Sequence, residues 1–270
     1  MGRARTPLSV SARLENDDLP VLWQLRFSHF NEKGRLALDY KGIRHVRRDL
    51  TPGTHPSRSK RLGGSGTTPL LQIGGRTIGD TTEIIAELER IRPEPPLYPD
   101  SEPDRLRALE LEDHFDVELG PYIRGAVFDA TLPYPREFVA ISTQGLGRRT
   151  QIMQRVMSPL TTRVVRRLLV DGPGGPEKCR AKTVAAIDRL EAELDGGDYL
   201  VGDGFTVADL TAAALLLPLV SPPEFQYRLP EAWPPPWEEF RRSLSDRPGY
   251  QWVQETFRRY RGSSAAVSDD

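Results

Sequence analysis

The stretch "TTPLLQIGGRTIGDTTEIIAEL", residues 67–88, decides the fold of the N-terminal part of the chain. It contains two short strands joined by Gly74 and Gly75, which supply the positive backbone dihedral angles that a tight hairpin needs. The apolar residues of "EIIAEL" then recur at helical spacing. The stretch therefore predicts a β-hairpin that runs directly into a helix.

Three further elements are predicted upstream of this hairpin. Residues 19–27, "LPVLWQLRF", form an apolar run that is typical of a buried strand. Residues 28–42 show helical spacing and end in a glycine, and residues 44–50 alternate as an exposed or edge strand does. Residues 51–67 are rich in Gly, Pro and Ser and are predicted to be a mobile loop. The predicted order is β-α-β-loop-β-β-α.

The chain changes character after this first unit, which spans residues 19–92. Residues 93–100 are rich in proline, which cannot continue a helix, so they predict a stiff linker. Residues 101–262 show helical periodicity and predict an all-helical domain. The polar ends, residues 1–18 and 263–270, are interpreted as flexible tails. The predicted fold class is α/β plus all-α.

Two local signals stand out in the helical part. Gly120 and Pro121 interrupt a long helical pattern and predict a kink. Thr206 and Asp209 form a T-x-x-D signal directly before the apolar run "LTAAALLLPLV". This signal is typical of a capping box, and it predicts a buried helix at the centre of the domain.

Composition argues against several classes of function. The chain has 270 residues, a formal net charge of -1 and a pI near 6.5, which does not suit a nucleic-acid-binding surface. The longest apolar run is about half the roughly 20 residues that a membrane helix needs. The four histidines show no metal-ligand spacing, and a single cysteine fits a reducing compartment. We therefore expect a cytoplasmic protein without a metal, a nucleic acid or a membrane as its partner.

The start of the helix after the hairpin has two interpretations. In a capping box, Asp80 accepts a hydrogen bond from a backbone N–H group and Glu83 reaches back to the cap. The free N–H groups and the positive dipole end can equally attract a carboxylate, while Asp80 holds an ammonium group. Local chemistry alone favours the simple cap.

Ser28 and Thr68 are also open to two interpretations each. Ser28 begins the first helix, so its hydroxyl is either an N-cap or a donor to a ligand thiol, whose pKa it would lower. Thr68 precedes Pro69, and a cis peptide there would turn the Thr68 backbone outward toward a peptide ligand. General preferences favour the cap and the trans peptide.

Four motifs together make the chain resemble a cytosolic glutathione S-transferase. They are "SHFNEKGRLALDYKGI" after the first strand, "TTPLL" with its expected cis-proline, "GDTTEI" for the usual acid-Ser pair, and "VGDGFTVADLTAAALL" for the buried capping-box helix. In this order they cover about residues 19–262. The resemblance implies a thioredoxin-like N-terminal domain followed by a helical C-terminal domain of the glutathione-transferase type.

The resemblance also implies a glutathione site. Thr68, with cis-Pro69, would pair its backbone with the cysteinyl part of glutathione, and Asp80 and Thr81 would bind the γ-glutamyl end. This implication reverses the preference that local chemistry gave to a simple cap.

Ser28 matches the family position that is serine or cysteine in several classes, so the resemblance makes it the expected stabiliser of the thiolate. Asn31 is the alternative for that role. His29 stands where proline is common, and Thr67 stands where lysine or glutamine often assists binding. These departures leave open the use of another low-molecular-weight thiol.

The helical domain is expected to supply the pocket for the second substrate. His114, Tyr122, Arg124 and Phe128 are the predicted lining residues on its first helix. Residues 132–176 are longer than the resemblance leads us to expect, and they are interpreted as a lid or as part of an altered acceptor pocket.

The implied function is activation of the glutathione thiol for attack on a small apolar electrophile. Conjugation, or a related lyase, isomerase or dehalogenase reaction, would use the same residues, and a homodimer is implied by the resemblance alone. A non-catalytic binding or assembly module of the same fold is the alternative, because a fold does not determine a function.

Overall fold

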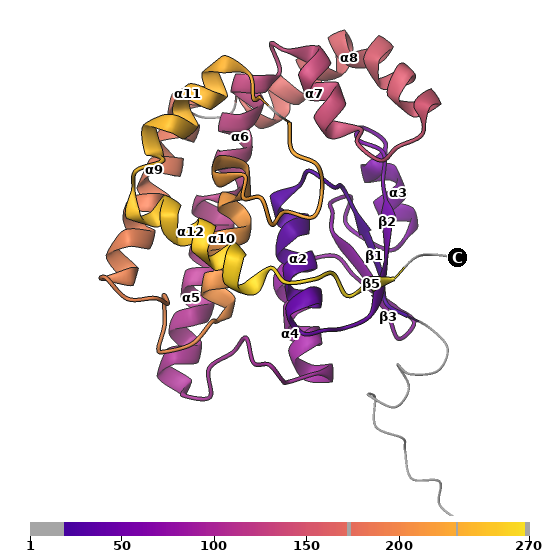
Figure 1. Cartoon of the computed structure of the whole chain (residues 1–270). Coiled ribbons are helices and arrows are strands. Elements are labelled where there is room, and N and C mark those ends of the chain that lie inside the picture. Colours follow the sequence, from indigo (N-terminus) through magenta and orange to yellow (C-terminus); the bar gives the residue numbers. More distant parts are fainter. Residues whose placement is uncertain (1–18, 172–173, 231, 268–270) are drawn as a thin grey trace, which may run out of the picture.

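The computed structural model describes residues 19–171, 174–230 and 232–267, which form a sheet-containing domain followed by a helical domain (Figure 1). The strands are β1 (Val21–Gln24), β2 (His45–Asp49), β3 (Leu70–Ile73), β4 (Arg76–Ile78) and β5 (Ala266–Val267). The helices of the first domain are α2 (His29–Tyr40), α3 (His55–Arg61) and α4 (Thr81–Ile91). The helices of the second are α5 (Glu102–Glu118), α6 (Gly120–Thr131), α7 (Pro135–Ser142), α8 (Arg148–Leu169), α9 (Gly175–Leu194), α10 (Val207–Val220), α11 (Pro235–Leu244) and α12 (Pro248–Tyr260). The tail expected at residues 1–18 lies outside the described residues.

A mixed sheet with strand order β4-β3-β1-β2-β5 forms the centre of the first domain. β1 pairs in parallel with β2 and antiparallel with β3, and β3 pairs antiparallel with β4. Gly74 and Gly75 join β3 to β4 with φ angles of 55° and 77°, as the predicted hairpin requires. α2 and α4 pack together on the side of the sheet that meets the helical domain (Figure 1). The predicted α/β plus all-α fold class is confirmed.

The loop predicted to be mobile at residues 51–67 contains helix α3 instead. Pro56 occupies the first turn of α3, where proline costs no backbone hydrogen bond. Ser59 is buried, and its hydroxyl accepts a hydrogen bond from the Gly66 N–H group over 3.0 Å. The glycines and prolines of this segment therefore flank a short helix and do not make the segment an irregular loop throughout.

The C-terminal segment also differs from the expected tail. Ala266 and Val267 form β5, which pairs in parallel with β2, so β2 lies inside the sheet rather than at its edge. The preceding Ala265 N–H group donates to the buried Asp39 carboxylate over 2.8 Å. Backbone pairing and this hydrogen bond hold a segment whose sequence has no strand pattern of its own.

Helix α10 is the centre of the helical domain, as predicted. Every residue of α10 except Pro218 is buried, and the helix packs against α2, α5, α6 and α12. The predicted capping box is present, because the Thr206 hydroxyl accepts from the Ala208 N–H group and Asp209 accepts from the Thr206 N–H group. No helix in the described part of the chain is long and apolar enough to cross a membrane.

Charged side chains of α2 are buried where the two domains meet. Arg261, which follows α12, forms ion pairs with Glu32 over 2.6 Å and with Asp39 over 2.7 Å, and all three side chains are almost inaccessible to solvent. Lys33 pairs with Glu112 of α5 over 2.8 Å. These contacts join α2 to α5, the first helix of the helical domain, and to the residue that follows α12, its last helix.

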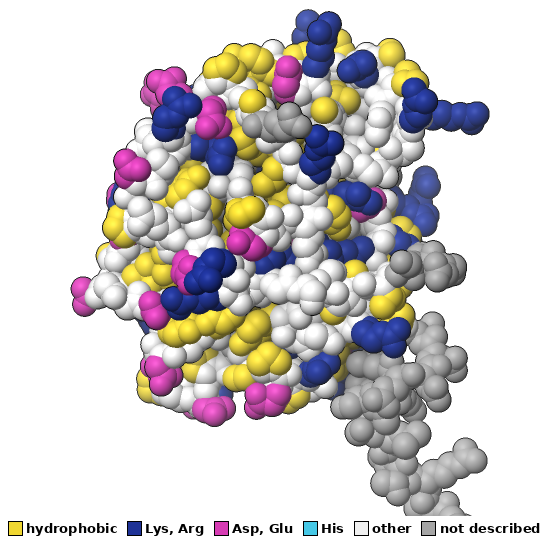
Figure 2. All heavy atoms as spheres, viewed as in Figure 1, with side chains coloured by type: hydrophobic (Ala, Val, Ile, Leu, Met, Phe, Trp, Pro, Cys, Tyr) yellow, Lys and Arg dark blue, Asp and Glu magenta, His cyan; other side chains and the backbone are white. Residues whose placement is uncertain are grey.

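Helices α7 and α8 occupy the long segment at residues 132–176, and they pack on each other and on α6. The sequence of α8 contains six arginines and no acidic residue. Figure 2 shows Lys and Arg side chains over the top and right of the molecule, where α8 and α3 lie, while most Asp and Glu side chains lie to the left and below. This end of the molecule is therefore positively charged.

We expect Asp209→Ala to lower the free energy of unfolding by roughly 2–4 kcal/mol, because it leaves buried donors without an acceptor. Those donors are the N–H groups of Leu200 and Thr206 and the Thr206 hydroxyl. Urea unfolding followed by circular dichroism measures the loss. The control is Asp203→Ala, which removes an exposed carboxylate just before α10; equal effects of the two variants would contradict the prediction.

Candidate functional site

A pocket of about 290 Å³ lies between the two domains. Residues 25–30, at the junction of β1 and α2, and residues 66–68, before β3, form its N-terminal side. Helices α6, α7 and α8 and the segment after α10 supply residues to the other side. Large apolar side chains line both sides, among them Phe27, Phe30, Phe128, Phe138 and Trp233. The long segment at residues 132–176 thus provides part of the pocket wall.

Ser28 lines this pocket and also caps helix α2. Its side-chain oxygen accepts a hydrogen bond from the Asn31 N–H group over 3.4 Å, and the side chain is half-buried. Among the described residues the Ser28 hydroxyl proton has no acceptor. The cap and a donor role toward a ligand are therefore compatible, because the cap uses a lone pair and leaves the proton available.

Asn31 is placed differently from Ser28. It is completely buried and is not part of the pocket lining. Its Oδ1 atom accepts from the Leu25 N–H group over 3.1 Å, and its Nδ2 atom donates to the Thr68 hydroxyl over 3.1 Å. Asn31 therefore ties together the two N-terminal segments that border the pocket.

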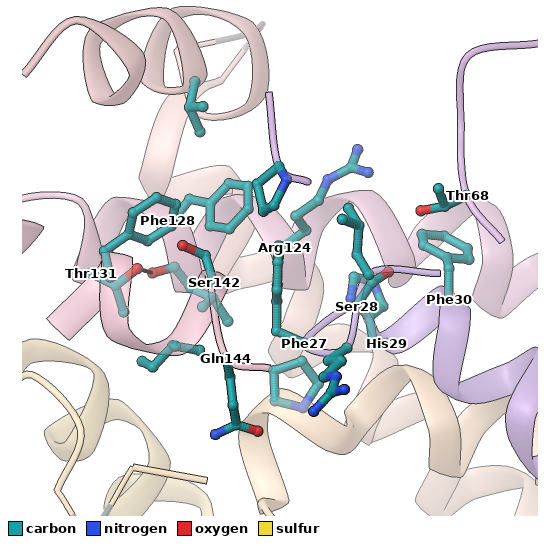
Figure 3. Close-up of a pocket in the computed structure, with 18 of the residues that line it drawn as sticks. Phe27, Ser28, His29, Phe30, Thr68, Arg124, Phe128, Thr131, Ser142 and Gln144 are labelled. Carbon is teal, nitrogen blue, oxygen red and sulfur yellow. Dashed lines mark hydrogen bonds between the residues drawn. The ribbon is translucent and has the colours of Figure 1, made fainter. Parts of the chain in front are cut away.

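Thr68 also lines the pocket, and Figure 3 shows it on the same side as Ser28 and Phe30. The Thr68-Pro69 peptide is cis, as the resemblance implied and against the general preference. Thr68 lies before the first paired residue of β3, and its backbone N–H and C=O groups have no hydrogen-bond partner among the described residues. An extended peptide could use both groups.

Asp80 and Thr81 begin helix α4 and do not line this pocket. Asp80 is exposed, and its Oδ1 atom accepts from the N–H groups of Thr82 and Glu83 over 2.9 and 3.3 Å. The predicted cap is therefore present, although Glu83 makes no return bond in the described structure. The second carboxylate oxygen of Asp80 keeps its acceptor capacity and its charge for a cation.

Two of the four residues predicted on the helical side line the pocket. Arg124 and Phe128 lie one turn apart on the same face of α6, and Phe128 packs edge-on against Phe138 of α7. Figure 3 shows Arg124 between Phe128 on one side and Ser28 and Thr68 on the other.

His114 and Tyr122 do not belong to the lining of this pocket. Tyr122 points to the other side of α6, where Lys178 and Lys182 of α9 lie 5.6 and 5.7 Å from its ring centroid. His114 belongs to α5, which the predicted break at Gly120 and Pro121 separates from α6. The rotation of α6 about its axis, unlike the break, cannot be seen from residue type alone.

His29 lines the pocket but was not predicted as a site residue. Its Nε2 atom lies 2.9 Å from the Gly120 carbonyl oxygen, to which a neutral imidazole donates. Burial, with a further contribution from Arg124, lowers the pKa of His29 to about 3. His29 is therefore uncharged at neutral pH and too weakly basic to serve as a general base.

Other reactive groups lie outside the pocket. Cys179 is buried on α9, and burial raises the pKa of its thiol, so it is a poor nucleophile. Within the described part of the chain no three His, Cys, Asp or Glu side chains form a group that could hold a metal ion. The polar groups that line the pocket include hydroxyl, amide, imidazole, backbone and guanidinium groups.

Family models match both domains. The model for the N-terminal domain of glutathione S-transferases matches residues 22–96, and the model for the C-terminal domain matches residues 159–243. The chain belongs to the glutathione S-transferase family. Its first domain is thus the thioredoxin-like domain of this family, and its second is the all-helical glutathione S-transferase domain. No match was found among curated proteins.

Solved glutathione S-transferase structures share the fold. A theta-class glutathione S-transferase from Xanthomonas axonopodis, with glutathione bound, is 15% identical with a TM-score of 0.54, and the match covers 92% of this chain and 100% of that one. A glutathione transferase from Phanerochaete chrysosporium is 16% identical, with a TM-score of 0.58 and coverage of 92% and 99%. A beta-etherase from Sphingobium is 20% identical, with a TM-score of 0.58 and coverage of 88% and 100%. At these identities the similarity shows the fold.

We expect Asn31→Ala to lower the free energy of unfolding by about 1–3 kcal/mol, because the buried Leu25 N–H group loses its acceptor. It should also loosen Thr68 and so weaken binding in the pocket. Urea unfolding measures the first effect. The control is Ser101→Ala, since this N-cap serine of α5 makes no side-chain cap bond; a loss in Asn31→Ala no larger than in the control would contradict the prediction.

Proposed function

We propose that this glutathione S-transferase family member is an enzyme that activates the thiol of glutathione for attack on a small apolar electrophile. One observation carries the proposal: the Ser28 hydroxyl and the unpaired backbone groups of Thr68 border the same pocket as the apolar wall of the helical domain. A thiol held at Ser28 would therefore meet an apolar reactant directly.

The residues that would hold glutathione have the chemistry it requires. The Thr68 N–H and C=O groups suit the backbone of the cysteinyl residue. The exposed carboxylate of Asp80 suits the ammonium group of the γ-glutamyl residue, and Thr81 at the α4 N-terminus suits its carboxylate. Support for this assignment comes from the free hydrogen-bonding capacity of Thr68 and Asp80.

Ser28 would favour the thiolate by donating a hydrogen bond to it, which lowers the thiol pKa. The thiolate then forms a C–S bond with the electrophilic carbon. In a substitution the leaving group departs with its bonding electrons, and in an addition the neighbouring carbon takes a proton from solvent. Positioning both reactants in one pocket contributes further to the rate.

Related lyase, isomerase or dehalogenase chemistry would use the same thiolate. We also propose that the enzyme is a cytoplasmic homodimer, as its family resemblance implies. Leu106 and Val117 are exposed apolar residues on α5, and they offer a surface for a second copy.

The proposal is tested by calorimetric titration with glutathione, followed by a turnover assay with chlorodinitrobenzene. Saturable binding together with turnover supports the enzyme. Binding of another small thiol, but not of glutathione, would retain the chemistry and replace the cosubstrate. If no thiol binds, the non-catalytic module becomes the better explanation.

We expect Ser28→Ala to lower kcat by about 10-fold to 100-fold while the Kd for glutathione changes only a few-fold, because the lost hydrogen bond is made mainly to the thiolate. The pH midpoint of kcat should move upward, since the bound thiol ionises less readily without the Ser28 donor. The control is Ser57→Ala on the exposed surface of α3. An unchanged kcat and pH profile would remove Ser28 from the chemistry.

We expect Asp80→Ala to raise the Kd for glutathione by roughly 10-fold, because the ligand ammonium loses its counter-ion. Asp80→Asn separates this effect from the cap, since the amide oxygen can still accept from the Thr82 and Glu83 N–H groups. Asp80→Asn should lose affinity but keep its stability to urea. Wild-type affinity in both variants would mean that Asp80 is only a helix cap.

A further inference from the structure

Arg124 carries a positive charge that no acidic side chain balances within residues 19–171, 174–230 and 232–267. Its Nε atom is inaccessible to solvent and has no hydrogen-bond partner, and its guanidinium group forms no ion pair among the described residues. Burial alone lowers the pKa of Arg124, because no neighbouring carboxylate opposes the effect. The side chain nevertheless reaches the wall of the pocket.

Arg26 also lines this pocket, but its positive charge is compensated by an ion pair. Its guanidinium group forms an ion pair with Asp49 over 2.6 Å, and Asp49 lies outside the pocket lining. None of the described lining residues is Asp or Glu. The lining histidines, His29 and His55, do not add charge at neutral pH, because burial lowers the pKa of both. The pocket thus has an excess of positive charge that centres on Arg124.

A buried unpaired charge costs free energy, and packing needs would be met equally well by an apolar side chain. A guanidinium group also presents a planar set of donors that matches a carboxylate with two parallel hydrogen bonds. Phe128, one turn away, and Phe138 beside it offer apolar surface for the body of such a ligand. Arg166 of α8 is paired with Asp129 and Asp171, but the other five arginines of this helix would attract an anion toward the same end of the molecule.

We propose that Arg124 is the anchor of an anion subsite, and that the electrophilic substrate of this protein is an organic acid whose carboxylate binds Arg124 while its apolar body lies against Phe128 and Phe138. This inference rests on the proposed function for the reaction itself. It narrows the substrate class from apolar electrophiles in general to carboxylate-bearing ones.

Two other anions could compete for Arg124. If the glutathione thiolate lies next to Arg124, the guanidinium charge favours ionisation of the thiol. If the glycine carboxylate of glutathione pairs with Arg124, the charge contributes to binding of the cosubstrate. In the first case the loss of Arg124 would slow neutral and anionic electrophiles equally and would raise the pKa of the bound thiol. In the second case it would raise the Kd for glutathione.

The test compares chlorodinitrobenzoate with chlorodinitrobenzamide, its neutral planar analogue. We expect the wild-type protein to favour the benzoate, and Arg124→Gln to reduce the ratio of the two kcat/KM values by about 10-fold to 100-fold. Arg124→Lys should keep part of the preference, because it retains the charge but loses the planar fork. Arg180→Gln is the control, and its ratio should stay near the wild-type value, because Arg180 is an exposed arginine of α9 that lies outside the pocket lining and pairs with Asp129.

A second arm measures binding without turnover, by titrating the protein with dinitrobenzoate and dinitrobenzamide, which carry no leaving group. A benzoate preference that is lost in Arg124→Gln supports the anion subsite even if neither chloro compound reacts, in which case only the proposed function fails. No benzoate preference in the wild type, or a preference that persists in Arg124→Gln, overturns the inference. Equal loss of turnover with both chloro compounds, or weaker glutathione binding in Arg124→Gln, would also overturn it in favour of the competing roles.

Discussion

The arrangement of the two domains depends on the buried charges of helix α2. Desolvating a charge is costly unless a partner is close, so Glu32 and Asp39 need cations inside the domain interface. Arg261, which follows α12, forms ion pairs with both Glu32 and Asp39. Arg47 of β2 forms a second ion pair with Asp39. Burial opposes ionisation of Asp39, but these two arginines outweigh it and lower the pKa of the carboxyl group. A shift between the domains would separate the buried Arg261 from Glu32 and Asp39, whereas Glu32 would keep its pair with Arg35 and Asp39 its pair with Arg47.

The pocket is a consequence of this fixed arrangement. The N-terminal end of α2 presents Ser28, and α2 also packs on the buried helix α10, so the helical wall stands at a set distance from the serine. Asn31, in the first turn of α2, then links the Ser28 segment to Thr68. Interface charges, core packing and buried amide hydrogen bonds therefore together determine the position of the Ser28 hydroxyl group.

The pocket has two chemically different sides. The N-terminal side offers hydroxyl and backbone groups with free hydrogen-bonding capacity, which suit a peptide-like thiol. The helical side offers aromatic rings and one unbalanced guanidinium group, which suit an apolar molecule with an anionic end. The second side is formed largely by α6, α7 and α8, and residues 97–158, which include α6, α7 and the first half of α8, lie outside the ranges that the two family models match.

The element order, the glycine hairpin, the capping box of α10 and the two-domain division could all be predicted from sequence, because each depends on residues within a few positions of one another. The set of residues that line the pocket could not be predicted from sequence. Arg124 and Phe128 line it while Tyr122 does not, because helix rotation decides which face of α6 is turned inward. The wall from α7 and α8 and the return of the chain to form β5 were likewise decided only by tertiary structure, since both depend on contacts between segments far apart in the chain.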